Sequence, residues 1–330
     1  MRAAMHRRAF LLSPLALAAC AVAPEGRVTA PGSRPTRRVA VTMDDPHLEE
    51  SPRLDPRARD AAILQTLAAR GAHAALFVCG MRVDSVEGAA LLARWSAAGH
   101  SLGNHSYSHR YFHSSKMSVA DFASEVDRGD AVLRPHLASA PRRRFRFPFL
   151  KEGDTREKRD GARRALAERG YTNGYVTIDA SDWAFDARLT RRLGRDPSAD
   201  VAPLRAAYVA HMLDRARYYD DLARTVLGRP VAHTMLVHHS LLNALFLGDV
   251  LDALVADGWT LIDAEAAFAD PLSRRAPDVL PAGESLIWSM AKERPDLVAP
   301  GALRYPGEDE DYERATLDRL EPPRATETRL

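Results

Sequence analysis

The sequence has few cysteines, a nearly balanced charge and no long apolar run, and each absence excludes a class of protein. Its 330 residues include only Cys20 and Cys79, and 46 basic against 44 acidic side chains leave a formal net charge of +2. Because the arginines are scattered among acidic residues, there is no concentrated basic face, and we expect no nucleic-acid partner. The apolar run 9–19 is too short to span a bilayer comfortably. The composition is that of an ordinary globular protein.

The N-terminus carries an export pattern. A basic start with Arg7 and Arg8 precedes the apolar run, which ends in Leu-Ala-Ala-Cys at Cys20. This ending resembles the lipobox of bacterial lipoproteins, and the paired arginines resemble a twin-arginine signal more weakly. We therefore predict a signal peptide over 1–20 and a flexible tether over 21–36, rich in Pro and Gly. The protein would be exported and held at the periplasmic face of the cell envelope by a lipid on Cys20. A cleaved signal without lipid and a disordered tail are the alternatives.

The second cysteine lies in an apolar run, "HAALFVCG". If Cys20 carries lipid, Cys79 has no intramolecular partner and no disulfide forms. We expect it to be a buried and inert strand residue.

Short apolar runs alternate with longer helical patterns after the tether. The pattern predicts strands over 37–43, 73–79, 144–149, 171–178, 232–238 and 259–262, with another ending near 103, and helices over 55–71, 85–99, 118–137, 154–170, 201–225 and 243–257. Asp154 is the expected N-cap of the fourth helix. This alternation is typical of an α/β fold with a parallel sheet and helices outside. We place the catalytic domain at 37–270. Residues 271–330 would be an extension, packed on that domain or partly disordered.

Polar side chains follow five successive predicted strands. They are Asp44 and Asp45, then Asn104, His105 and His109, then Arg146, then Asp179 with Asp182 and Trp183, and finally His238 and His239. The carboxyl ends of parallel strands meet on one face, where catalytic groups gather. Taken singly, each group has an ordinary structural reading, such as a helix cap, an ion pair or a core histidine. The joint pattern favours a site.

Histidines recur every four residues at His105, His109 and His113. Four residues are about one helical turn, so neighbouring pairs in this series are placed to share a metal ion. The spacing alone does not decide which two bind.

Five short motifs carry a family resemblance. "TMDD" (42–45), "HSYSH" (105–109), "RFPF" (146–149), "DASDW" (179–183) and "LVH" (236–238) follow one another in this order. They resemble the five motifs of the polysaccharide deacetylases, the NodB-homology family or carbohydrate esterase family 4. The resemblance spans about 38–265 and implies the family's distorted (β/α) barrel.

The resemblance also implies a metal site made of Asp45, His105 and His109, with His113 outside it as a surface residue. Two imidazoles and one carboxylate suit Zn²⁺ or another divalent transition metal, and they leave coordination positions open. Such a metal polarises the acyl carbonyl and lowers the pKa of water.

The remaining motif residues take catalytic roles by the same resemblance. Asp44 matches the base and Arg146 the group that holds it. The backbone N–H of Phe149 matches an oxyanion donor.

His238 matches the general acid, Asp182 the carboxylate that tunes it, and Trp183 a wall of the acyl pocket. Asp179 and His239 are left without a definite role.

The sequence departs from the family pattern near the paired acids. Met43 replaces a common Phe, Pro46 follows Asp45 directly where Gly-Pro is common, and Phe149 stands where Tyr is frequent. The changed loop bears on substrate choice more than on catalysis. We expect a metal-dependent hydrolase that removes N-acetyl groups from an amino-sugar polysaccharide of the cell envelope. The alternatives are an O-acetyl esterase, a hydrolase of a small acylated amine, or a glycan-binding lipoprotein without activity.

Overall fold

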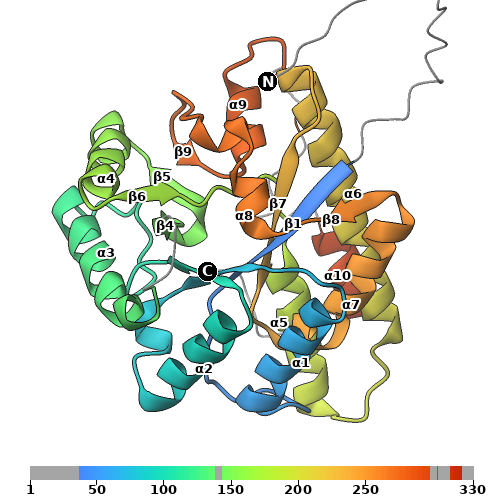
Figure 1. The fold of residues 1–330 in the computed structure, drawn as a ribbon. Helices are drawn as coiled ribbons and strands as arrows, with labels where there is room; N and C mark the ends of the chain where they lie inside the picture. Colours follow the sequence, from blue (N-terminus) through green and yellow to red (C-terminus); the bar gives the residue numbers. More distant parts are fainter. Residues whose placement is uncertain (1–36, 138–142, 298–302, 304–312, 322–330) are drawn as a thin grey trace, which may run out of the picture. The chain divides into compact units, whose positions relative to one another are not determined.

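A parallel sheet organises the fold (Figure 1). The computed structural model describes residues 37–137, 143–297, 303 and 313–321, so the predicted signal peptide and tether lie outside the described residues. Within these residues the strand order is β6-β4-β3-β2-β1-β7, and β8 pairs with β1. The strands are β1 (Arg37–Asp44), β2 (Ala75–Val78), β3 (Ser101–Asn104), β4 (Arg143–Phe145), β6 (Tyr171–Asn173), β7 (Ala232–His238) and β8 (Trp259–Leu261). All these pairings are parallel, which confirms the predicted α/β class.

The segment 171–178 connects the two ends of the strand order. Its first part, β6, pairs with β4, whereas Ile178 forms an isolated parallel bridge with Met235 of β7. Between them, Gly174 N donates to Phe145 O at 2.6 Å and Thr177 N donates to Thr234 O at 3.1 Å. The segment thus leaves one edge of the sheet and reaches the other. This is the curvature of a distorted barrel, but no continuous ladder closes the barrel among the described residues.

Helices follow most strands and begin at residues that cap them. They are α1 (Pro56–Ala68), α2 (Val86–Ala97), α3 (Val119–Leu133), α4 (Arg156–Glu168), α5 (Asp182–Arg195), α6 (Ala202–Leu227), α7 (Leu241–Ala256) and α8 (Ala264–Phe268). Side chains of Asp55, Ser85, Ser118 and Ser240 accept backbone N–H groups at four of the N-termini. The predicted Asp154 cap of α4 is wrong. Thr155 accepts from Lys158 N, and Asp154 instead pairs with the Lys158 ammonium at 3.3 Å.

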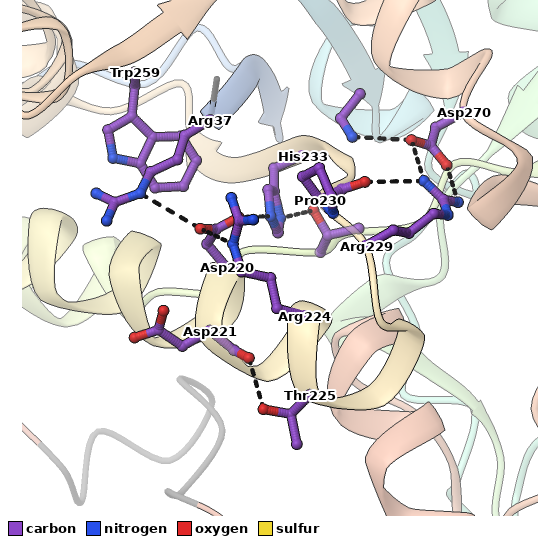
Figure 2. Close-up of polar contacts among 12 residues, drawn as sticks. Arg37, Asp220, Asp221, Arg224, Thr225, Arg229, Pro230, His233, Trp259 and Asp270 are labelled. Carbon is purple, nitrogen blue, oxygen red and sulfur yellow. Dashed lines mark hydrogen bonds and ion pairs between the residues drawn. The ribbon is translucent and has the colours of Figure 1, made fainter. Parts of the chain in front are cut away.

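A buried carboxylate joins α6 to the sheet, as Figure 2 shows. Asp220 lies 2.9 Å from Arg224 on its own helix and 3.4 Å from Arg37 at the start of β1. His233 of β7 places Nε2 3.5 Å from the same carboxylate. Asp220 is 1% exposed, so this shared pairing offsets the cost of burying its charge.

The described part of the C-terminal extension packs on the rest of the chain. Strand β9 (Ala282–Gly283) pairs antiparallel with β5 (Lys151–Gly153), and α9 (Leu286–Lys292) contacts α6. Helix α10 (Arg314–Leu320) also contacts α6, and its Leu317 is fully buried in the main core. No helix among the described residues is long and apolar enough to cross a membrane.

Candidate metal and catalytic site

The carboxyl ends of the strands surround a pocket of about 410 Å³. It is lined by Asp44, Asp45, Arg82, His105, His109, Phe149, Leu150, Asp179, Trp183, Leu236 and His238. The structure thus brings together side chains that are up to 194 residues apart in the sequence, from Asp44 to His238. The predicted Arg146 and Asp182 lie directly behind the lining.

Three side chains form a candidate metal-ligand set. One ligand atom from each of Asp45, His105 and His109 lies within 4.8 Å of the other two. Asp45 Oδ2 is 3.3 Å from His109 Nε2, and its buried Oδ1 has no hydrogen-bond partner. Carboxylate and imidazole donors with an orphaned buried oxygen fit a divalent metal ion. His113 is not part of the set.

The protonation of these groups also suits metal binding. His105 Nδ1 lies 2.9 Å from the Arg146 carbonyl, which only accepts, so Nδ1 carries the proton and Nε2 keeps its lone pair. Burial lowers the pKa of His109 to about 4, although Asp45 opposes the shift. Burial alone would raise the pKa of Asp45, but His105, His109 and Arg82 together hold it below its usual value. The set therefore presents a neutral His109 imidazole and an ionised Asp45 carboxylate at neutral pH.

The loop that carries the histidines is held by nearby polar side chains. Ser106 N donates to Asn104 Oδ1 at 2.9 Å, and His109 N donates to Ser106 Oγ at 3.0 Å. Ser108 donates to Glu125 Oε2 of α3 through both its N–H (2.6 Å) and its hydroxyl (2.7 Å). The loop is irregular rather than helical, so the two histidines meet through these bonds and not through helical spacing.

Left-handed backbone conformations gather at the pocket. Asp45, Ser106, His109, Phe149 and Leu150 have φ between 53° and 65°. Such values are uncommon for residues other than glycine and cost free energy that the surrounding structure must supply. These conformations reverse the chain locally, so that neighbouring residues face the same pocket. Consecutive residues of a regular strand or helix do not point in one direction.

The predicted base has a buried guanidinium behind it. Asp44 is 2% exposed and accepts from Arg146 Nη1 at 2.6 Å. Arg146 also donates to Thr42 Oγ1 at 3.0 Å and to Gly174 O at 2.9 Å, so its three nitrogens are all engaged. The other Asp44 oxygen, Oδ2, lies 3.6 Å from His105 Nε2. Arg146 therefore orients Asp44 with one oxygen facing the metal-ligand set.

The ring of Phe77 packs against the Arg146 guanidinium group. The centroid of the Phe77 ring lies 3.9 Å from the Arg146 guanidinium carbon. The same ring lies close to the backbone of Gly174 and Gly103. A Cβ at Gly174 would stand 2.3 Å from the ring, and one at Gly103 would stand 2.5 Å from it. Both positions therefore need glycine for the close approach.

The predicted acid and its partner form the tightest imidazole–carboxylate pair at the site. His238 Nδ1 and backbone N both lie 2.7 Å from the Asp182 carboxylate. Asn243 Nδ2 donates to the same carboxylate at 2.7 Å, and Tyr208 OH donates to Asn243. Burial opposes protonation of His238, but Asp182 with Asp44 and Asp45 raises its pKa to about 10. A protonated imidazole thus faces the pocket.

Aromatic side chains line the entrance. Trp183 is 39% exposed and Phe149 is 44% exposed, which is unusual for large apolar side chains. The Phe149 ring packs against His109 and against Tyr111, with ring centroids 4.6 and 5.5 Å apart. Tyr111 is itself 45% exposed. The pocket lining therefore includes exposed aromatic faces as well as polar groups.

Sequence reasoning missed several residues and misplaced one. Arg82, which lies 3.7 Å from Asp45, follows β2 and so carried the same strand-end signal as the predicted residues. Asn243 carried no such signal. His113 is not a surface residue, because its Nε2 is 3.1 Å from both Gly153 N and Ala282 O, between β5 and β9. It is partly buried there by the C-terminal extension.

Two residues left open or considered inert now have clear surroundings. His239 is 1% exposed and faces Asp60 at 3.3 Å, away from the lining of the pocket. Cys79 is fully buried and its thiol donates to Tyr107 O. Burial raises the pKa of this thiol to about 11, which agrees with an unreactive side chain.

A family comparison matches the first part of the described chain. Residues 32–173 match the sequence model of a family described as polysaccharide deacetylase. This match confirms the predicted resemblance of the chain to the polysaccharide deacetylase family over 142 of its 330 residues. The matched residues include Asp44, Asp45, His105, His109 and Arg146, whereas the DASDW and LVH motifs lie beyond them. No curated protein matches the sequence.

Solved structures of family members are similar to the chain in fold. A polysaccharide deacetylase from Bacillus cereus has 20% identity and a TM-score of 0.50, covering 69% of this chain and 91% of its own. A peptidoglycan deacetylase from Bacillus subtilis has 20% identity and a TM-score of 0.45, covering 70% and 90%. A CE4 family pseudoenzyme from Bacillus anthracis has 16% identity and a TM-score of 0.47, covering 70% and 65%. The first of these supports the family fold for this chain.

Proposed function

We propose that this protein is a metal-dependent hydrolase that removes N-acetyl groups from an amino-sugar polysaccharide of the cell envelope. One observation carries the proposal. A three-residue metal-ligand set shares one pocket with an arginine-held carboxylate, Asp44, and a carboxylate-held imidazole, His238. The family match supports the deacetylase class, and the export pattern of the N-terminus supports the location.

Each residue of the site has a separate role in the proposed reaction. Asp45, His105 and His109 would hold the divalent metal, Zn²⁺ being well suited, and the ion would supply Lewis-acid polarisation of the acyl carbonyl. Asp44 takes a proton from the water that attacks the carbonyl carbon, and Arg146 holds this carboxylate in position. The Phe149 N–H is proposed to bear part of the charge that develops on the carbonyl oxygen.

The leaving amine requires a proton, because an amide anion is a very poor leaving group. His238 donates that proton to the sugar nitrogen as the C–N bond breaks, and Asp182 stabilises the imidazolium beforehand. The water oxygen ends in acetate and the amine remains on the sugar. Trp183 and Leu236 line the pocket and are proposed to pack against the acetyl methyl group.

The test is acetate release by the purified protein from peptidoglycan, chito-oligosaccharides and poly-N-acetylglucosamine. Each substrate is assayed with added Zn²⁺, with chelator, and with Zn²⁺ restored after the chelator is removed. We expect release from at least one polymer that stops with chelator and returns with metal. An O-acetylated sugar is run beside them, so that faster ester hydrolysis would identify an esterase. Glycan binding without release, by protein that holds one metal ion, would contradict the proposal and favour a glycan-binding protein without activity.

We also propose that the protein is exported and anchored through a lipid on Cys20. The support is the basic start, the short apolar run and the Leu-Ala-Ala-Cys ending. Expression of the full chain in a bacterial host with labelled palmitate should label the wild-type protein and not the C20A variant. Unlabelled, fully secreted wild-type protein would contradict the anchor.

A further inference from the structure

Asp179 is a buried acid of the pocket that the proposed chemistry does not use. It follows Ile178, which bridges β7, and its side chain lines the pocket while the residue is only 3% exposed. Its backbone carbonyl accepts from Arg215 Nε at 3.0 Å. Its carboxylate oxygen Oδ2 is buried and has no hydrogen-bond partner.

The other polar side chains of the lining already have tasks. Asp45, His105 and His109 form the ligand set, and Arg82 lies beside Asp45. Asp44 is held by Arg146, and His238 is held by Asp182.

The remaining lining side chains cannot accept a hydrogen bond. Phe149, Leu150 and Leu236 have no polar side-chain atom, and the Trp183 indole only donates. Among the described side chains of the lining, Asp179 is therefore the one acceptor that is neither a proposed metal ligand nor part of an ion pair.

A buried carboxylate oxygen without a hydrogen-bond partner is costly, so its place in a substrate pocket calls for a ligand. Burial, and then the nearby Glu284, raise the pKa of Asp179 to about 7, against the effect of Arg215. Near neutral pH the group therefore exists in both its ionised and its neutral form. A hydroxyl group both donates and accepts, so it matches either form, whereas an ammonium matches only the ionised one.

We propose that Asp179 is a substrate-binding residue that hydrogen-bonds a hydroxyl group of the sugar carrying the acetamide. This inference rests on the proposed function, because it takes the substrate to be a sugar. It adds a polar contact to the sugar in a pocket whose other lining side chains without an assigned role are largely apolar. It predicts that Asp179 selects acetylated sugars over acetyl compounds that lack a sugar ring.

The experiment compares a sugar substrate with one that has no sugar. N-acetylated chitotetraose binding is measured by calorimetry, and its kcat/KM by acetate release. p-Nitrophenyl acetate serves as the second substrate, since it offers the acetyl group without a sugar hydroxyl. The variants are D179A, D179L and D179N, and D130N is the control, because Asp130 is a buried acid outside the pocket lining.

We expect D179A to weaken chitotetraose binding about tenfold, with the change in KM larger than that in kcat. The ratio of kcat/KM for chitotetraose to that for p-nitrophenyl acetate should fall by a similar factor. D179N keeps hydrogen-bonding atoms in place and should stay within about threefold of wild type. D179L fills the volume of the carboxyl group, and it provides the measurement if D179A does not fold. D130N should leave the ratio unchanged.

Two results would overturn the assignment. One is equal binding of chitotetraose by wild type, D179A and D179L. The other is an equal loss on both substrates, which would indicate a structural role. Binding is read independently of turnover, so the two proposals fail separately. Wild-type protein that binds chitotetraose without releasing acetate contradicts the proposed function, and a tenfold weaker D179A still supports this assignment. Neither binding nor release by the wild type would contradict both.

Discussion

Two histidines on the same strand, five residues apart, have pKa values shifted in opposite directions. His238 ends β7 at the pocket and pairs with Asp182 at 2.7 Å, and His233 lies at the other end and faces Asp220 at 3.5 Å. The pKa of His238 is raised to about 10, whereas burial lowers that of His233. Both are aspartate–histidine pairs in a buried setting. The residue types alone therefore do not decide which pair is chemically useful.

The difference comes from what else each carboxylate binds. The donors to Asp182 are neutral, namely the His238 backbone N–H and the Asn243 amide. Its charge is therefore available to stabilise the imidazolium. Asp220 is shared with the guanidinium groups of Arg37 and Arg224, as Figure 2 shows, so its charge is already balanced. Thr177 holds the other nitrogen of His233 at 3.1 Å and the ring has no access to solvent. The Asp182–His238 pair keeps an imidazole protonated at the pocket, whereas the Asp220–His233 pair links α6 to β7.

The largest expected effect comes from removing the base beside the first pair. D44N should lower acetate release about 10²–10⁴-fold, because the amide cannot take a proton from water. Metal content should stay at the wild-type value, since Asp44 is not one of the three proposed ligands. Both are measured on the same preparation, by acetate assay and by metal analysis. Substantial activity in D44N protein would show that another group acts as the base.

The next effect sharpens the role of the Asp182–His238 pair. An acid catalyst is active below its own pKa, so the basic limb of the wild-type profile should lie near pH 10. D182N removes the charge that raises the His238 pKa, while burial still lowers it. The limb should therefore move to lower pH by several units, and kcat at neutral pH should fall about 10–100-fold. Acetate release between pH 5 and about 11 gives both numbers. An unshifted limb would rule out His238 as the acid.

The second pair should respond in stability and not in pH profile. D220N removes the counter-charge of Arg224, whereas Arg37 keeps Asp257 at 3.0 Å. Both guanidinium groups are about one-third exposed and can be solvated. We expect the free energy of unfolding to fall by about 1–3 kcal/mol, measured by urea denaturation. The pH dependence of kcat should match that of the wild type. A shifted basic limb in D220N would mean that the two ends of β7 are coupled.

The smallest effect sets the baseline for an ion pair outside both regions. Arg70 pairs with Asp252 at 2.7 Å, and Asp252 is 68% exposed. D252N should change the free energy of unfolding by less than about 1 kcal/mol and leave the acetate assay untouched, because exposed ion pairs are solvated and screened. A loss as large as that of D220N would show that burial does not distinguish the two carboxylates.

Much of the arrangement could be predicted from short patterns. Strand ends with polar residues predicted the elements that face the pocket, since parallel strands present their carboxyl ends on one side. Local capping was harder where two cap-forming residues adjoin, as at Asp154 and Thr155. The roles of His113 and Asn243 depend on contacts with segments far along the chain, so no local pattern marks them.

The sequence by itself determined the α/β alternation, the resemblance to the family and the group of polar residues at the strand ends. These features follow from periodicity and from motifs of a few residues, which are local properties of the chain. The tertiary structure decided which acid stands beside which base, which histidine of β7 is protonated, and that Asp179 lines the pocket with a buried oxygen that has no hydrogen-bond partner. Charge and burial depend on neighbours brought together from across the chain, and only the folded arrangement specifies them.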